Sequence, residues 1–100
     1  MVTVGLLATL HAKSGKEDEL ASFLESALPL AQAEDDTVAW FAIKIDRGTY
    51  GIFDVFPGSE GRQAHLDGLI AAALMGKADD LLSTPPDIKP IDVLAAKLPS

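Results

Sequence analysis

Apolar positions are densest in the middle of the chain, and their pattern there predicts a β-hairpin. Two runs rich in β-branched and aromatic residues, 38–45 and 50–56, are typical of strands. The segment 46–49 between them contains Gly48, which is free to adopt the positive φ of a tight turn. With a two-residue loop at 47–48, the expected cross-strand pairs are Ile45 with Tyr50, Ile43 with Ile52, and Phe41 with Asp54.

Both faces of this predicted hairpin carry apolar side chains. An antiparallel sheet in a small protein usually leaves one face to water. Helices of the same chain can cover one face, so we expect a second copy of the chain to cover the other. The pattern therefore predicts a homodimer formed through the open face of the sheet.

The segments before the hairpin predict a strand and a helix. Residues 2–12 alternate between two faces, which is typical of a strand. Ser14 is expected to cap a helix whose first turn carries the acidic residues 17–19. Apolar residues recur at three- and four-residue steps over 20–28, and Pro29 is expected to break or kink this helix.

The segments after the hairpin predict a second helical region and a last strand. The helix is expected to begin at Gly58 or Ser59, and Gly68 to divide a short helix from a longer one. Residues 88–97 predict a strand in which Pro90 implies an edge or a bulge. The element order is that of an α+β, ferredoxin-like βαββαβ fold, with a four-stranded antiparallel sheet and both helical segments on one face. We expect residues 1–100 to form a single domain.

Composition removes several classes of function. The chain has no cysteine, which excludes disulfides, thiolate metal sites and a thiol nucleophile and fits a reducing compartment. A formal charge of −7 argues against binding to nucleic acid or to anionic membrane surfaces. No apolar run approaches the length of a membrane span, and the first residues lack the pattern of a signal peptide. We therefore expect a cytoplasmic protein with no membrane and no nucleic-acid partner.

Four short segments resemble the antibiotic biosynthesis monooxygenase family, and most closely its small quinol monooxygenase members. They are 28–31 (Leu-Pro-Leu-Ala), 53–57 (Phe-Asp-Val-Phe-Pro), 63–66 (Gln-Ala-His-Leu) and 70–75 (Ile-Ala-Ala-Ala-Leu-Met). The resemblance covers nearly the whole chain and implies a dimeric α+β barrel built from two face-packed sheets. The family includes cofactor-free oxygenases of polyphenols, quinol oxidases, haem-degrading enzymes and members with no known reaction, so the fold does not decide the activity.

The chain departs from that family in two respects. It contains no asparagine, a residue that some family monooxygenases and the haem-degrading relatives use in the pocket. The haem-degrading branch also has an axial histidine beside a tryptophan on the later helix. Here His65 lies early in that helix, and the only tryptophan, Trp40, lies in the hairpin.

Asp54 and His65 are the candidate catalytic residues. Asp54 lies in the most apolar strand, and His65 follows soon after the turn that ends it, so the two side chains are expected to meet. Such a pair would remove a phenolic proton, with His65 as general base and Asp54 orienting or charging the imidazole. The alternative is that Asp54 accepts hydrogen bonds from the start of the second helix while His65 lies in an interface.

The aromatic residues of the hairpin are the candidate binding residues. They would line a pocket for a flat aromatic ligand, and the alternative for each is plain core packing. No metal site is expected, because His11 and His65 are the only histidines and the acidic clusters, including 34–36, are interpreted as solvated. The five candidate binding residues are Trp40, Phe41, Tyr50, Phe53 and Phe56.

Two functions of different classes follow. The first is a cofactor-independent monooxygenase or quinol oxidase that acts on a small phenol or hydroquinone, with no cofactor. The second is a non-catalytic dimeric module that binds a small molecule or serves a stress response. They are distinguished by whether Asp54 and His65 converge on a cavity large enough for a bicyclic ring.

Overall fold

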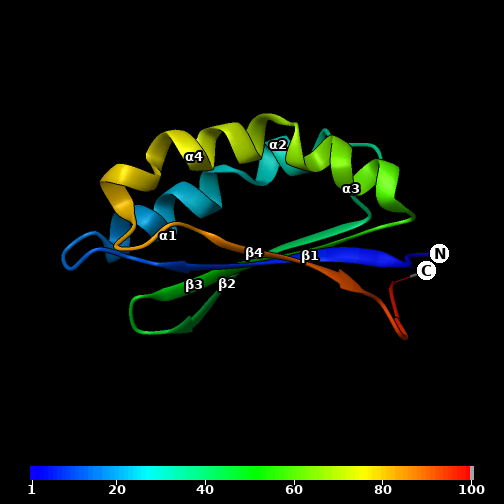
Figure 1. Cartoon of the computed structure of the whole chain (residues 1–100), viewed down its shortest axis with the longest axis horizontal. Coiled ribbons are helices and arrows are strands. Elements are labelled where there is room, and N and C mark those ends of the chain that lie inside the picture. The colour runs from blue at the N-terminus through cyan, green and yellow to red at the C-terminus, as the bar shows by residue number, and fades with distance from the viewer. Residues whose placement is uncertain (100) are drawn as a thin grey trace.

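Within residues 1–99, four helices cover one side of a four-stranded antiparallel sheet (Figure 1). The structure is a computed structural model that describes residues 1–99. The sheet order β2-β3-β1-β4, with two helical segments as crossovers, is the ferredoxin-like arrangement, so the predicted fold is confirmed. In chain order the elements are β1 (Val4–His11), α1 (Glu17–Ser26), α2 (Leu28–Gln32), β2 (Ala39–Asp46), β3 (Thr49–Phe56), α3 (Ser59–Leu66), α4 (Leu69–Leu81) and β4 (Asp87–Asp92).

Proline and glycine divide both helical regions where the sequence indicates. α1 ends at Ser26, and Pro29 lies in the first turn of α2. The N–H groups of a first turn have no partner within the helix, so the missing N–H of Pro29 costs no hydrogen bond. Gly68 is the residue that precedes α4. The predicted cap was wrong: α1 begins after Lys16, and the chain instead turns at Gly15, whose φ is +85° and whose N–H donates to Glu17 Oε1. No helix within residues 1–99 is long and apolar enough to cross a bilayer.

The outer strands follow from alternation and from the proline. In β1, Leu6, Ala8 and Leu10 point into the helix-covered core, as their period-2 spacing predicts. β4 is an edge strand, which agrees with Pro90 within it. It spans Asp87–Asp92 and is shorter than the predicted strand 88–97.

The hairpin forms as predicted, but its register differs by one residue. Gly48 has φ +79°, and Asp46 pairs with Thr49 around it. Beyond this turn Lys44, not Ile45, pairs with Tyr50, so Ile45 is an extra residue in β2. The predicted pairing of Phe41 with Asp54 was therefore wrong. The unpaired Ile45 shifts the register of the β2 residues that precede it by one, so their side chains lie on the opposite face of the sheet from the one predicted.

The corrected register separates the aromatic residues. Phe41 pairs with Phe53, and their rings stack with centroids 6.4 Å apart. Because side chains alternate along a strand, this pair lies on the face opposite Asp54, away from the helices of residues 1–99. Trp40 pairs with Asp54 on the helix-covered face. Phe41, Ile43 and Ile45 remain exposed, and these three residues define the open face.

The molecule exposes more surface than its size requires. Its accessible surface is 6225 Å², whereas a compact monomer of 10.5 kDa exposes about 5,400 Å². The excess includes residues away from the sheet, such as Leu94, which is 97% exposed. The open face is an apolar surface without cover from residues 1–99, and the homodimer stays a prediction.

Candidate active site

Asp54 is a buried carboxylate in the middle of the sheet. It lies on β3 between Leu6 of β1 and Trp40 of β2, and its side chain points toward the helices. The side chain is 1% exposed. A charged group so deep in an apolar layer is stable only beside a compensating charge.

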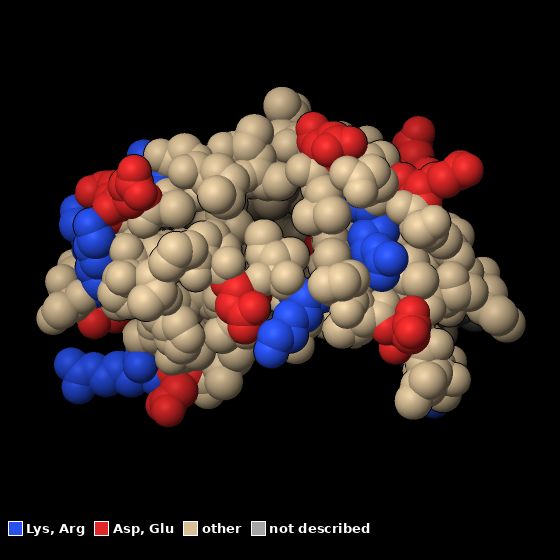
Figure 2. Space-filling view, viewed as in Figure 1, with Lys and Arg blue, Asp and Glu red and all other residues tan. Residues whose placement is uncertain are grey.

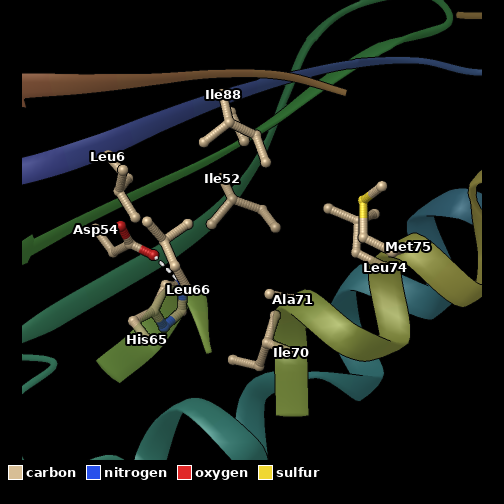
Figure 3. A pocket seen from close by; sticks show the side chains of 11 residues that line it. Leu6, Ile52, Asp54, His65, Leu66, Ile70, Ala71, Leu74, Met75 and Ile88 are labelled. Carbon is tan, nitrogen blue, oxygen red and sulfur yellow. Dashed lines mark ion pairs between the residues drawn. The ribbon is translucent and has the colours of Figure 1, made fainter. Parts of the chain in front are cut away.

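His65 supplies that compensation. Its position on α3 places the imidazole against the sheet, where Nε2 lies 3.0 Å from Asp54 Oδ2 (Figure 3). The Phe56 ring packs beside it with a centroid distance of 5.4 Å. The structure thus brings together the two residues that their order in the chain indicated.

The alternative arrangement, in which Asp54 accepts hydrogen bonds from the start of the second helix, is not the one observed. No hydrogen bond of good geometry reaches either carboxylate oxygen from the described part of the chain. The contact with His65 is an ion pair by its distance, and Asp54 Oδ1 has no hydrogen-bond partner within residues 1–99.

Glu34 is a third member of this cluster that sequence reasoning missed. Its Oε1 lies 2.6 Å from His65 Nδ1 and also accepts a hydrogen bond of 2.7 Å from Thr37 Oγ1. The predicted hairpin indicates that Glu34 and His65 lie at the same end of the sheet. Residues 39 and 55 are neighbours, so the link before β2, which holds Glu34, and the segment after β3, which leads to His65, both lie at that end.

The two carboxylates determine the protonation of His65. Burial alone would lower the pKa of the imidazole, but the adjacent carboxylates of Asp54 and then Glu34 outweigh burial and raise its pKa to about 9. Only an imidazolium has an N–H to donate at both ring nitrogens. At neutral pH His65 is therefore an imidazolium between the carboxyl groups of Asp54 and Glu34.

The acidic link between α2 and β2 packs against two glycines. A Cβ at Gly61 would lie 2.8 Å from Asp36 Cβ, and a Cβ at Gly68 would lie 3.1 Å from Glu34 Oε2. Both glycines thus leave room for the link. The interpretation of this acidic run as merely solvated was wrong for Glu34, whose carboxylate is only 21% exposed.

A small apolar pocket opens beside Asp54. Its walls come from the sheet on one side and from α3 and α4 on the other (Figure 3), and Figure 2 shows a hollow between these layers. Met75 and Ile88, which both line it, are also exposed at the surface. Besides Asp54 and His65, the lining residues are all apolar: Leu6, Ala8, Ile52, Leu66, Ile70, Ala71, Leu74, Met75 and Ile88.

The pocket is small. Its volume is about 50 Å³, whereas a cavity of roughly 150 Å³ holds benzene. Asp54 and His65 therefore converge on a cavity, but in this conformation it does not admit a bicyclic ring. A ligand of that size requires side chains at the pocket mouth to move.

The five hairpin aromatics do not line this pocket. Phe56 and Tyr50 are buried in the core, and Trp40 packs against the core from β2. Phe41 and Phe53 alternate along their strands with Trp40 and Asp54, so they face away from the helices of residues 1–99. The expected aromatic lining is replaced by aliphatic residues, which fill the space between the sheet and α4.

Neither histidine belongs to a metal-binding group. Within residues 1–99 there is no cluster of three or more histidine, aspartate or glutamate side chains arranged to hold a metal ion. His11 is exposed at the end of β1, with Nδ1 3.4 Å from Thr49 Oγ1. The acid–base chemistry of the described residues is thus concentrated at Asp54, His65 and Glu34.

Comparison with known proteins identifies a close relative of this chain. No protein-family model and no curated protein matches the chain. Among solved structures, this chain is similar to NE2512, a protein of unknown function from Nitrosomonas europaea. The two are 56% identical with a TM-score of 0.98, and the match covers 100% of this chain and 97% of NE2512.

More distant structures share the fold alone. A provisionally named antibiotic biosynthesis monooxygenase from Nitrosomonas europaea matches with a TM-score of 0.82 at 10% identity, over 92% of this chain and 99% of its own. Another protein with this provisional name, from Caulobacter crescentus, matches with a TM-score of 0.78 at 16% identity. This match covers 94% of this chain and 92% of the Caulobacter chain. The resemblance read from the sequence is therefore confirmed at the level of the fold.

Proposed function

The chain belongs to the same family as the Nitrosomonas europaea protein NE2512, and from its site geometry we propose that it oxidises a small phenol or hydroquinone with molecular oxygen. The fold shared with provisionally named monooxygenases supports this reaction class. The proposed activity is that of a cofactor-independent monooxygenase or quinol oxidase.

The observation that carries the proposal is the unpaired oxygen of Asp54. Asp54 lines the pocket, and its buried Oδ1 accepts no hydrogen bond from the described residues. An unsatisfied buried acceptor costs about 1–3 kcal/mol, and a substrate hydroxyl would satisfy it. Asp54, rather than His65, is then the general base, because both nitrogens of His65 already face carboxylates and the ring is protonated at neutral pH.

The reaction begins with a proton transfer. The substrate O–H gives its proton to Asp54 Oδ1 and becomes a phenolate, while the His65 imidazolium offsets the remaining negative charge. Oxygen chemistry usually needs a cofactor, and an electron-rich phenolate avoids this by donating the electrons itself. The apolar walls exclude water from the reacting ring.

Two balanced outcomes are possible for a hydroquinone. As an oxidase, the protein would transfer two electrons and two protons to O2, giving the quinone and hydrogen peroxide. As a monooxygenase, it would insert one oxygen atom, so that hydroquinone and O2 give hydroxyquinone and water. The ratio of peroxide formed to O2 consumed separates them: one for the oxidase and zero for the monooxygenase.

The substrate has to widen the pocket. Its mouth includes Met75 on α4, whose unbranched and exposed side chain moves at low energetic cost. A single ring is expected to enter more readily than a bicyclic one. Substrates with one ring should therefore have the lower KM.

The test is oxygen uptake with a panel of hydroquinones and phenols, without added metal or flavin. Asp54→Asn should lower kcat by roughly 10²–10⁴, the usual effect of removing one acid–base group. Asp92→Asn, which neutralises an exposed aspartate on β4, is the matched control and should leave kcat unchanged. Uptake that never exceeds the uncatalysed rate for any substrate would contradict the proposal.

A non-catalytic binding module is the second candidate, and the small pocket volume favours it. Trp40, the only tryptophan, is paired with Asp54 across the sheet and reports ligand binding by its fluorescence. Saturable quenching by a small aromatic compound without oxygen uptake would establish this candidate. Quenching together with uptake would favour the enzyme.

The active form in this proposal is a homodimer. The open face is apolar and exposed, and exposed apolar patches are typical of protein–protein interfaces. Packing the open faces of two chains together would remove these residues from water. Light scattering at micromolar concentration tests it, and a folded monomer there would contradict it.

A further inference from the structure

We propose that Glu34 is a positioning residue of this site, which holds His65 as an imidazolium and through it keeps Asp54 ready to accept a proton. The inference rests on the proposed function for its effect on catalysis. Its effect on His65 can be measured without any turnover.

The geometry gives His65 one carboxylate at each nitrogen. Nδ1 lies 2.6 Å from Glu34 Oε1, and Nε2 lies 3.0 Å from Asp54 Oδ2. A neutral imidazole has a single N–H and would present a lone pair to one of these oxygens. The bridged arrangement is therefore favourable only when the ring carries both protons.

Among the described residues, no other charged group competes for this ring. From β3 the facing group is Asp54, from the α2–β2 link it is Glu34, and the neighbouring Phe56 is uncharged. Arg62, on the same helix as His65, points to the carbonyl oxygens of Gly5 and Ile91. Within residues 1–99, Asp54 and Glu34 are the only ionic partners of His65.

Glu34 is itself held in place. Its backbone carbonyl accepts from Thr37 N–H, and its carboxylate accepts from the hydroxyl of the same residue. The absence of a side chain at Gly68 leaves room for Oε2. A carboxylate fixed in this way loses little conformational freedom when it binds the imidazolium, as expected of a positioning group.

The consequence for the reaction is electrostatic. Asp54 acts as a base only while it is a carboxylate, and the imidazolium stabilises that charge inside an apolar pocket. Removing the charge of Glu34 makes the imidazolium less stable. The ring then loses its proton at lower pH, and Asp54 loses its positive partner over a wider pH range.

The first experiment is an NMR titration of the histidine rings in the resting protein. The chain has only two histidines, so exposed His11 serves as an internal reference. Glu34→Gln keeps the shape and an acceptor oxygen but removes the charge, and the acid dissociation constant of His65 should rise about tenfold or more. Asp35→Asn, a neutralised acid in the same link, is the matched control and should not move it.

Two results would overturn the inference. One is that His65 titrates at the same pH in Glu34→Gln as in the original chain. The other is that Asp35→Asn shifts the titration by as much as Glu34→Gln. If Glu34→Gln does not fold, the His65 ring of the unmodified protein provides the test. A His65 ring that carries only one N–H at pH 8 would contradict the assignment.

The second experiment measures oxygen uptake against pH with a substrate that the protein turns over. The alkaline limb of kcat should move to lower pH in Glu34→Gln, so that the loss of activity is greater at pH 8 than at pH 6. A loss of equal size at all pH values would indicate a merely structural role and reject the positioning role. Absence of turnover in the unmodified protein would refute the proposed function, while the NMR titration would still test Glu34.

Discussion

The protonated His65 should make the stability of this protein fall at alkaline pH. Its pKa is about 9 in the folded chain and 6.5 when unperturbed. A raised folded-state pKa means that the folded chain binds the proton more tightly, so the stabilisation is complete below pH 6.5 and is lost as the pH rises through 9. The side chain is only 8% exposed, so solvent screening reduces the effect little.

The size of the effect follows from the shift. At about 1.4 kcal/mol per pKa unit, the difference between 9 and 6.5 corresponds to about 3 kcal/mol of unfolding free energy. That is a large part of the roughly 5–15 kcal/mol by which small domains are stable. In a chain of 100 residues it corresponds to a fall in Tm of more than about 10 °C.

Urea unfolding between pH 6 and 10, followed by the fluorescence of Trp40, measures this dependence. His65→Gln should be less stable than the unmodified chain at pH 6, and its stability should change much less between pH 6.5 and 9. His11→Gln, a change at the exposed histidine, should keep the original slope. The protein concentration has to be held constant, because dissociation of a dimer would also alter the transition.

Parallel stability curves for the unmodified chain and His65→Gln would refute the reasoning. They would mean that the proton on His65 binds equally well in the folded and the unfolded chain. If His65→Gln does not fold, the slope of the unmodified chain and of His11→Gln remains measurable. A flat slope in both of these proteins would lead to the same conclusion.

Four further predictions concern the open face, two glycines and the base. Phe41→Asp should prevent dimer formation in light scattering, whereas Leu69→Asp, on exposed α4, should not. Gly5→Ala should destabilise by about 1–3 kcal/mol in thermal unfolding, because its Cβ would lie 2.5 Å from the carbonyl oxygen of Asp54; an unchanged Tm would contradict this. Gly76→Ala, within α4 and with no atom near the added Cβ, should instead stabilise by roughly 0.5–1 kcal/mol. Asp54→Asn should weaken the shift of His65, so that the ring titrates at lower pH by NMR.

Much of the fold was predictable because its signals are local. Alternation identified β1 and the hairpin, and Pro29 and Gly68 divided the helices where chain geometry requires. The hairpin register was not predictable. The alternating pattern of β2 is the same with or without one unpaired residue, so nothing in it indicates that Ile45 is inserted.

The site was predictable only where the residues are near each other in the chain. Asp54 and His65 are separated by one turn and the start of a helix, so their contact could be expected. Glu34 lies 31 positions before His65. The hairpin places its link beside the segment after β3, but a charge run on that link does not indicate which member turns inward. The aromatic residues were misleading because size and apolarity predict burial without indicating which cavity a side chain borders.

The packing of the acidic link on two glycines has a consequence for how related chains can diverge. A side chain at position 68 would displace the Glu34 carboxylate, and one at position 61 would displace Asp36. Positions 34 and 68 are thus expected to covary among homologues: where a larger residue replaces the glycine, a shorter or neutral residue should replace the glutamate. An alignment in which position 68 varies freely while position 34 stays acidic would show that the link tolerates another path.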